Sequence, residues 1–284
     1  MVTRLDGHVV VEHTFFSFQA PKGHWIFLCF PELIRLAARF QLTMSVENGI
    51  LDITLQDRTT DEVFQFRLIS GQEINILVEV FIEQFYQFVN SMDCLDVGAN
   101  IGASAIYMAR FHGCKVIAFE PVPETFRRLV DHVKLNKLES LVECHCTGLS
   151  DRSGSAQVLY DPNFSGSASE KGIYGSSSVV GNIKLEGELV DIQLTDALNV
   201  FETTLTELSE NIFLKLDCEG AEHRILAWLK STDEFKRVKM IATEVHATSS
   251  NSIREFRESL VQEGFFLFER SASVDDLTFL QGSR

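Results

Sequence analysis

The stretch DVGANIG, residues 96–102, decides the fold, because it follows the apolar run Asp93–Val97 and precedes a helical pattern. Gly98 and Gly102 have no side chain, so backbone N–H groups in such a turn can closely approach a ligand. Asn100 stands where the usual pattern has a glycine, and Asn tolerates left-handed backbone angles. The stretch therefore predicts a ligand-binding turn between a strand and a helix.

Strands and helices continue to alternate after this turn. We expect strands at 115–119, 142–147, 212–216, 240–245 and 265–269, and helices at 103–111, 123–136, 221–230 and 252–263. This alternation indicates an α/β fold with a doubly wound, mostly parallel sheet of the Rossmann-like type. Ligands of such sheets lie at the carboxyl ends of the strands.

Residues 1–90 have a different pattern, with strands expected at 9–11 and 50–55 and helices at 31–40 and 74–90. We expect an N-terminal α/β extension over 1–90 and a ligand-binding domain over 91–284. The main interpretation of the 23 phenylalanines is that they pack in the core. Those of the N-terminal part also leave open an apolar acceptor pocket or a homodimer interface.

The charge balance limits the partners. The chain has 40 acidic and 25 basic residues, a net charge of −15, and no run of Lys or Arg. We expect no nucleic-acid partner, because binding of phosphates needs a basic surface. The six cysteines and the charged N-terminus indicate reduced thiols in a cytoplasmic protein. No apolar run is long enough to predict a membrane span.

A serine- and glycine-rich stretch interrupts the alternation, within a loop that we place near residues 161–190. It predicts a flexible loop, either a plain surface loop or a lid over the ligand. The apolar runs 156–160 and 189–194 on either side predict an extra hairpin that carries it.

Two further motifs point to a nucleoside. Glu120 ends the second strand, where a carboxylate accepts hydrogen bonds from ribose hydroxyls; the alternative is an acidic residue at a helix start. Ser150 and Asp151 follow the third strand, where a polar side chain can meet an adenine edge; Asp151 could equally be a turn residue.

Acidic residues and a histidine end the last two parallel strands. Asp217 and Glu219 follow the strand 212–216, and helix capping is the alternative role for Glu219. Glu244 and His246 share one side of the next strand. His246 is placed to act as a general base, or it is a structural histidine.

Together these motifs resemble those of the FkbM family of methyltransferases. The matching stretches are DVGANIG (96–102), FEP (119–121), GLSDRSG (148–154), LKLDCEGAE (214–222) and EVH (244–246). The resemblance implies a class I methyltransferase fold with S-adenosylmethionine (SAM) as cofactor, and O-methylation of a small-molecule acceptor. It also implies cofactor contacts from Asp96, Gly98, Asn100, Gly102 and Glu120, with Ser150 or Asp151, and places Asp217 in the active site.

For catalysis we expect His246 to act as the base towards a hydroxyl acceptor, with Asp217 or Glu219 orienting it or acting in its place. A hydroxyl acceptor needs a base, whereas a carboxylate acceptor needs an anchor such as His223 or Arg224. Asp217, Glu219, Glu244 and His246 could also converge on Mg²⁺, but their charge near a sulfonium explains them without a metal, so we predict none.

Three other functions stay open as alternatives. The first is an N-methyltransferase, disfavoured because residues 217–220 read DCEG and not the Pro-Pro motif of many such enzymes. The second is an NAD-dependent oxidoreductase, disfavoured because the turn at 96–102 is not GxGxxG. The third is a SAM-binding module without catalysis.

Overall fold

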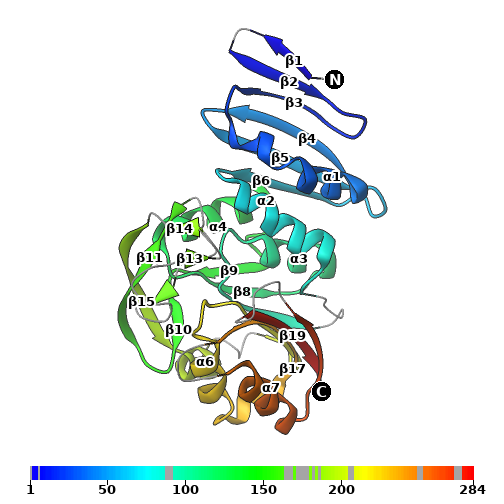
Figure 1. The fold of residues 1–284 in the computed structure, drawn as a ribbon. Helices are drawn as coiled ribbons and strands as arrows, with labels where there is room; N and C mark the ends of the chain where they lie inside the picture. Colours follow the sequence, from blue (N-terminus) through cyan, green and yellow to red (C-terminus); the bar gives the residue numbers. More distant parts are fainter. Residues whose placement is uncertain are drawn as a thin grey trace.

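The computed structural model describes residues 2–5, 7–86, 92–162, 169–170, 179–180, 183–184, 187–203, 208–247, 252–271 and 277–284. Its centre is a seven-stranded sheet with the order β18-β19-β17-β16-β7-β8-β9 (Figure 1). The strands are β7 (Asp93–Val97), β8 (Val116–Phe119), β9 (Val142–His145), β16 (Ile212–Leu216), β17 (Val238–His246), β18 (Phe266–Ser271) and β19 (Leu277–Ser283).

The central sheet is mostly parallel, as predicted. The strands β9, β8, β7, β16 and β17 pair in parallel, and β19 runs antiparallel between β17 and β18. The sequence pattern did not predict β19. The strand expected to be the last, at 265–269, is β18, and β19 follows it in the chain. Thr278, Phe279 and Leu280 of β19 are buried in succession, so the strand lacks the alternation of buried and exposed residues that a sequence pattern detects.

Helices cover both faces of this sheet. Side chains alternate along the strands, so Cys94 and Phe213 belong to one buried cluster while Leu95 and Leu214 belong to another. The helices of the ligand-binding part are α3 (Ala103–His112), α4 (Pro123–Leu135), α5 (Ala197–Thr203), α6 (Glu222–Leu229) and α7 (Ile253–Gln262), with a 3₁₀ helix at Asp233–Arg237. α3 contributes to the first cluster, and α5, α6 and α7 contribute to the second.

The N-terminal part consists of two three-stranded antiparallel sheets and short helices, and it lies at one end of the molecule (Figure 1). Its elements are β1 (Val2–Leu5), β2 (His8–Glu12), β3 (Ser17–Pro21), η1 (Trp25–Leu28), α1 (Phe30–Arg39), β4 (Phe40–Glu47), β5 (Ile50–Asp57), β6 (Val63–Leu68), α2 (Gly71–Val78) and the π-helix η2 (Glu79–Glu83). The helix expected over 74–90 ends at Glu83, because Gln84 takes a left-handed φ of 52°.

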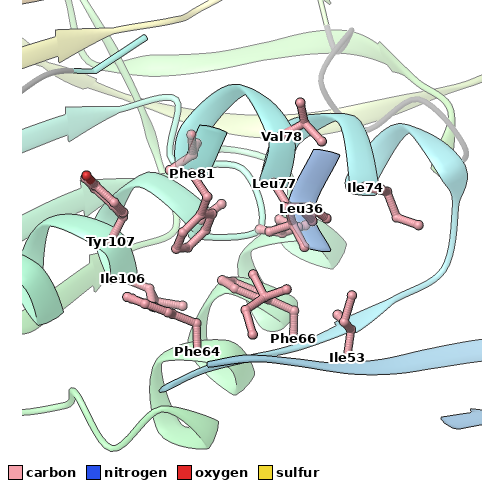
Figure 2. Close-up of a cluster of buried hydrophobic side chains, with 14 of the residues drawn as sticks. Leu36, Ile53, Phe64, Phe66, Ile74, Leu77, Val78, Phe81, Ile106 and Tyr107 are labelled. Atoms are coloured by element: carbon pink, nitrogen blue, oxygen red, sulfur yellow. The ribbon is translucent and has the colours of Figure 1, made fainter. Parts of the chain in front are cut away.

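Aromatic packing joins this part to the rest. Phe64, Phe66 and Phe81 pack beside Ile106 and Tyr107 of α3 (Figure 2). The ring of Phe81 meets that of Tyr107 edge-on at 5.3 Å between centroids. The two parts therefore share one continuous core.

Side chains at the C-terminal end of α4, including its capping residue Asn136, also satisfy the backbone of β6. Asn136 accepts a hydrogen bond from Gln65 N at 2.9 Å and donates one to Gln65 O at 2.8 Å. His132 accepts from Arg67 N at 3.0 Å. These bonds replace a neighbouring strand along that edge of the sheet.

The predicted extra hairpin is confirmed. β11 (Gly154–Tyr160) and β15 (Glu188–Asp196) pair antiparallel, and β10 (Gly148–Ser150) and β12 (Ser169–Glu170) complete their sheet. Two further short strands pair with each other, β13 (Val179–Val180) and β14 (Ile183–Lys184). Much of the predicted loop near 161–190, and with it the choice between lid and surface loop, lies outside the described residues.

Among the described residues, no helix combines the length and the apolar character that crossing a membrane requires.

Candidate active site

A cavity opens at the carboxyl ends of β7, β8 and β16. Polar residues line one part of it, among them Gly98, Asn100, Glu120, Asp217, Glu219 and Arg224. Apolar residues line the other part, among them Leu149, Ala156, Val158, Ile192 and Leu194.

The turn at 96–102 has the backbone conformation that its residues predict. Gly98, Asn100 and Gly102 have φ angles of 81°, 50° and 86°. A Cβ on Gly98 would lie 1.7 Å from the carbonyl oxygen of Asp217, and one on Gly102 would lie 2.5 Å from Leu129 Cδ1. The absence of a side chain at Gly98 therefore lets β7 and β16 meet directly below the cavity.

Asp96 lies beneath the cavity and does not appear among the described residues that line it. It is fully buried, accepts a hydrogen bond from Ser104 Oγ at 2.6 Å and pairs with Lys215 Nζ at 2.9 Å. Its predicted direct contact with a cofactor stays a prediction. In this geometry Asp96 holds Lys215, which in turn holds the turn above it.

Lys215 is a residue of the site that sequence reasoning missed. Its Nζ donates to Gly98 O at 2.7 Å and lies 3.8 Å from Asp217 Oδ2, with a side chain only 2% exposed. Burial lowers its pKa, but the charges of Asp96 and Asp217 outweigh burial and raise the pKa above the usual range. A lysine within the apolar strand IFLKL was the available signal, because burial of a lysine requires a partner.

Glu120 lies at the end of β8, lines the cavity and is 7% exposed. Its carboxylate accepts hydrogen bonds from Asn100 N at 3.0 Å and Val122 N at 2.9 Å. Burial raises its pKa to about 7, more than these two bonds lower it. Each of its oxygens has capacity for a further donor.

Asn100 offers a second acceptor. Its Oδ1 is buried and, within the described parts of the chain, has no hydrogen-bond partner. A buried polar atom without a partner is costly, so a donor from a bound ligand would satisfy it. Glu120 and Asn100 together fit a ligand that carries hydroxyl or ammonium donors.

Ser150 and Asp151 do not line the cavity, as far as the described residues define it. Ser150 is buried, and its Oγ donates to Asp151 Oδ1 at 3.0 Å. Their neighbours Gly148 and Leu149 line the cavity in their place. The predicted ligand contacts of Ser150 and Asp151 therefore stay predictions.

The apolar wall of the cavity was not foreseen. Ala156 and Val158 of β11 and Ile192 and Leu194 of β15 line it together with Leu149. The sequence pattern predicted the hairpin, but only the tertiary structure brings the hairpin over the end of the sheet. A flat apolar ring would fit between such walls.

Asp217 and Glu219 line the cavity as expected from their place after β16. Asp217 Oδ2 accepts a hydrogen bond from the Tyr86 hydroxyl at 3.0 Å. Glu219 has a left-handed φ of 51°, and burial raises its pKa to about 8, despite the lowering effect of nearby His246. Burial therefore favours the protonated form of Glu219.

His246 lies behind Glu219. Its Nε2 is 3.5 Å from Glu219 Oε2 and its Nδ1 is 3.3 Å from Glu222 Oε1. Burial disfavours the charged ring, but these carboxylates and that of Glu244 outweigh burial and raise the pKa to about 10. These carboxylates favour the charged form of the ring, and the base role of His246 stays a prediction.

The neighbouring groups complete the acidic end of the site. Burial and the charge of Asp217 raise the pKa of Glu244 to about 9. His223 Nε2 lies 2.9 Å from the carbonyl oxygen of His246, whereas Arg224 lines the cavity. No group of three or more His, Cys, Asp or Glu among the described residues is arranged to hold a metal ion.

Comparison with known proteins assigns the family. The model of the FkbM methyltransferase domain matches residues 96–267, more than half of the chain. The chain belongs to this family. It is a methyltransferase, and the matched range contains the turn, Glu120, Asp217 and His246.

The individual relatives are distant. Methyltransferase sdnD of Sordaria araneosa is 28% identical over 214 residues, which are 67% of this chain and 81% of the relative. Methyltransferase 1 of Beauveria bassiana is 30% identical over 162 residues, 53% of this chain and 65% of the relative. A matching segment also forms 11% of the AMB antimetabolite synthetase AmbE of Pseudomonas aeruginosa.

Solved structures give weaker similarity. M. capricolum TrmK in complex with S-adenosyl-homocysteine has a TM-score of 0.42 and 11% identity, over 71% of this chain and 66% of that one.

Proposed function

We propose that this FkbM-family protein transfers a methyl group from SAM to a hydroxyl or carboxylate oxygen of a small molecule. The observation that carries the proposal is buried Glu120 at the end of β8, which lines the cavity and can accept further hydrogen bonds. A ribose offers two adjacent neutral hydroxyls to such a group, whereas a 2′-phosphate would be repelled.

The donor set around the cavity fits SAM in three places. Glu120 would hold the ribose hydroxyls, and the apolar wall with Val158 and Ile192 would enclose the adenine. The orphan Oδ1 of Asn100 would accept from the ammonium group of the methionine part. Gly98 keeps the turn free of side-chain atoms beside that part.

When bound, SAM supplies an electrophilic methyl group on a positively charged sulfur. The task of the chain is to hold the acceptor oxygen about 3–3.5 Å from the methyl carbon and in line with the bond that breaks. The carboxylate of Asp217 favours positive charge in this part of the cavity.

For a hydroxyl acceptor, we propose Asp217 as the proton acceptor. It lines the cavity and is held by Tyr86. His246, charged between Glu219 and Glu222, would hold the loop of Glu219 in place. Glu219, whose protonated form burial favours, would donate a hydrogen bond to the acceptor. For a carboxylate acceptor no base is needed, and Arg224 would anchor the anion.

The proposal is tested with the purified protein, SAM and a panel of alcohols, phenols, carboxylic acids and amines. Mass spectrometry identifies which compound gains a methyl group and on which atom. We expect methylation at oxygen, and for a hydroxyl acceptor Asp217→Asn should lower kcat by about 10²–10⁴-fold. Asp233→Asn, at an exposed position, is the matched control. Methylation at nitrogen alone would contradict the assignment to oxygen.

A further inference from the structure

Tyr86 belongs to the N-terminal part, outside the range that the family model matches, yet it reaches the site. Its hydroxyl donates to Asp217 Oδ2 at 3.0 Å, and its side chain is 7% exposed. Lys215 Nζ lies 5.1 Å from the centre of its ring and 3.8 Å from the same Asp217 oxygen. The Tyr86 hydroxyl and the Lys215 ammonium therefore both face Asp217 Oδ2.

The segment that carries Tyr86 is anchored to the far edge of the central sheet. Arg270 Nη1 donates to Glu83 O at 3.0 Å, and its guanidinium lies 5.7 Å from the ring centre of Phe85. Phe279 of β19 meets the ring of Phe85 at 5.0 Å and that of Tyr86 at 5.5 Å. These contacts hold the Tyr86 ring without involving its hydroxyl, so the hydroxyl is not needed to pack the ring.

The hydroxyl keeps its proton under ordinary conditions. Burial, together with the charges of Asp217, Glu244 and Glu79, holds the pKa of Tyr86 well above its usual range. The bond to Asp217 is therefore a neutral donor to a carboxylate, the stronger class of hydrogen bond.

We propose that Tyr86 is a positioning residue, whose hydroxyl holds the Asp217 carboxylate towards the cavity at the place that receives the positive sulfur of the cofactor. This inference rests on the proposed function. Asp217 lines the cavity, and its backbone contacts the turn at Gly98, so its carboxylate lies beside the part assigned to methionine. Without the hydroxyl, Lys215 still faces that oxygen, at 3.8 Å, but the carboxylate is held less firmly towards the sulfur.

The test compares SAM with S-adenosylhomocysteine, which lacks the methyl group and has a neutral sulfur. Calorimetric titration of both ligands into the full chain gives the ratio of their Kd values, which reports charge at the sulfur. Tyr86→Phe should weaken SAM binding about tenfold, since a hydrogen bond to a charged group is lost, and should change the Kd of S-adenosylhomocysteine less than about twofold.

Two variants make the test specific. Tyr107→Phe removes a hydroxyl from another buried tyrosine, which packs on Phe81 and Phe111, and should leave both Kd values unchanged. Asp217→Asn should reproduce the selective loss of SAM binding, and adding Tyr86→Phe to it should have no further effect. The double variant thus separates action through Asp217 from loss of packing.

An unchanged ratio in Tyr86→Phe, or equal weakening of both ligands, would overturn the inference. If Tyr86→Phe does not fold, an unchanged ratio in Asp217→Asn would overturn it as well. Failure of the wild-type protein to bind either ligand would instead count against the proposed function itself.

Discussion

The two parts of the molecule differ in how far their structure can be predicted from short stretches of sequence. In residues 2–86, antiparallel strands and short helices are held by aromatic packing, with Phe64 and Phe81 fully buried. In residues 92–284, a parallel sheet carries polar side chains at its strand ends, where Glu120 and Asp217 line a cavity. Short motifs can reveal the second kind of structure, whereas the first depends on contacts between distant residues.

The difference also shows how each part can affect function. Damage to the packing of the N-terminal part should lower stability and leave ligand affinity of the folded protein intact. Substitutions in the turn at 96–102 or at Glu120 should lower ligand affinity and leave stability largely unchanged. Tyr86 is the exception, because it belongs to the first part and contacts the second.

The largest expected effect is on stability, from Phe81→Ala. Phe81 is fully buried and meets four aromatic rings edge-on, those of Phe40, Phe64, Phe66 and Tyr107. We expect the free energy of unfolding to fall by about 3–5 kcal/mol, measured in urea. Phe266→Ala, at a side chain 79% exposed, should change it by less than about 0.5 kcal/mol. Loss of SAM affinity in a folded Phe81→Ala variant would contradict the view that packing of the N-terminal part affects stability alone.

Next in size is the effect of Gly98→Ala on ligand binding. The new Cβ would meet the Asp217 carbonyl oxygen at 1.7 Å, so the turn or β16 must move. We expect SAM to bind more than about a hundredfold more weakly, measured by calorimetry. Gly113→Ala is matched, because Gly113 also has a positive φ but nothing lies within 4 Å of its Cβ position. Equal losses in the two variants would show that strain, not the contact with Asp217, is responsible.

A smaller effect is expected from pH. Burial raises the pKa of Glu244 to about 9 and that of Glu219 to about 8, and carboxylates raise that of His246 to about 10. Each pKa is higher in the folded state, so the folded state binds more protons and the stability from these groups is lost as pH rises towards 9. The thermal midpoint should therefore fall between pH 6 and pH 9.

Glu244→Gln sharpens this prediction, because it removes one of the groups that must ionise. The fall in thermal midpoint between pH 6 and pH 9 should shrink by about 2–4 °C in this variant. Glu139→Gln, on the surface, should leave the fall unchanged. A midpoint that rises with pH in the wild-type protein would contradict the assigned direction.

Most of the central sheet was predictable from periodicity and turn residues. The runs that became β7, β8 and β16 are apolar and end at Gly98, Glu120 and Asp217, so both the strands and the site edge could be inferred. β19 and the end of the helix at Glu83 were missed, because both depend on local detail that periodicity does not record.

The site was predictable only where residues act near their own strand end. Lys215 and Tyr86 gain their roles from partners across the fold, Asp96 and Asp217, that sequence distance conceals. The contact between His246 and Glu222 of α6 was concealed for the same reason, because Glu222 lies 24 residues before it in the sequence. The sequence therefore predicts at which strand end a residue lies better than it predicts which side chains the residue contacts.

The central claim is that Glu120 marks a site for SAM. It is tested most directly by calorimetric titration of SAM and S-adenosylhomocysteine into the wild-type protein and into Glu120→Ala, with Glu139→Ala as the surface control. We predict that both ligands bind the wild-type and control proteins and bind Glu120→Ala about 10–100-fold more weakly, because hydrogen bonds to a carboxylate are lost. Folded wild-type protein that binds neither ligand, or a Glu120→Ala variant with unchanged affinity, would contradict the account.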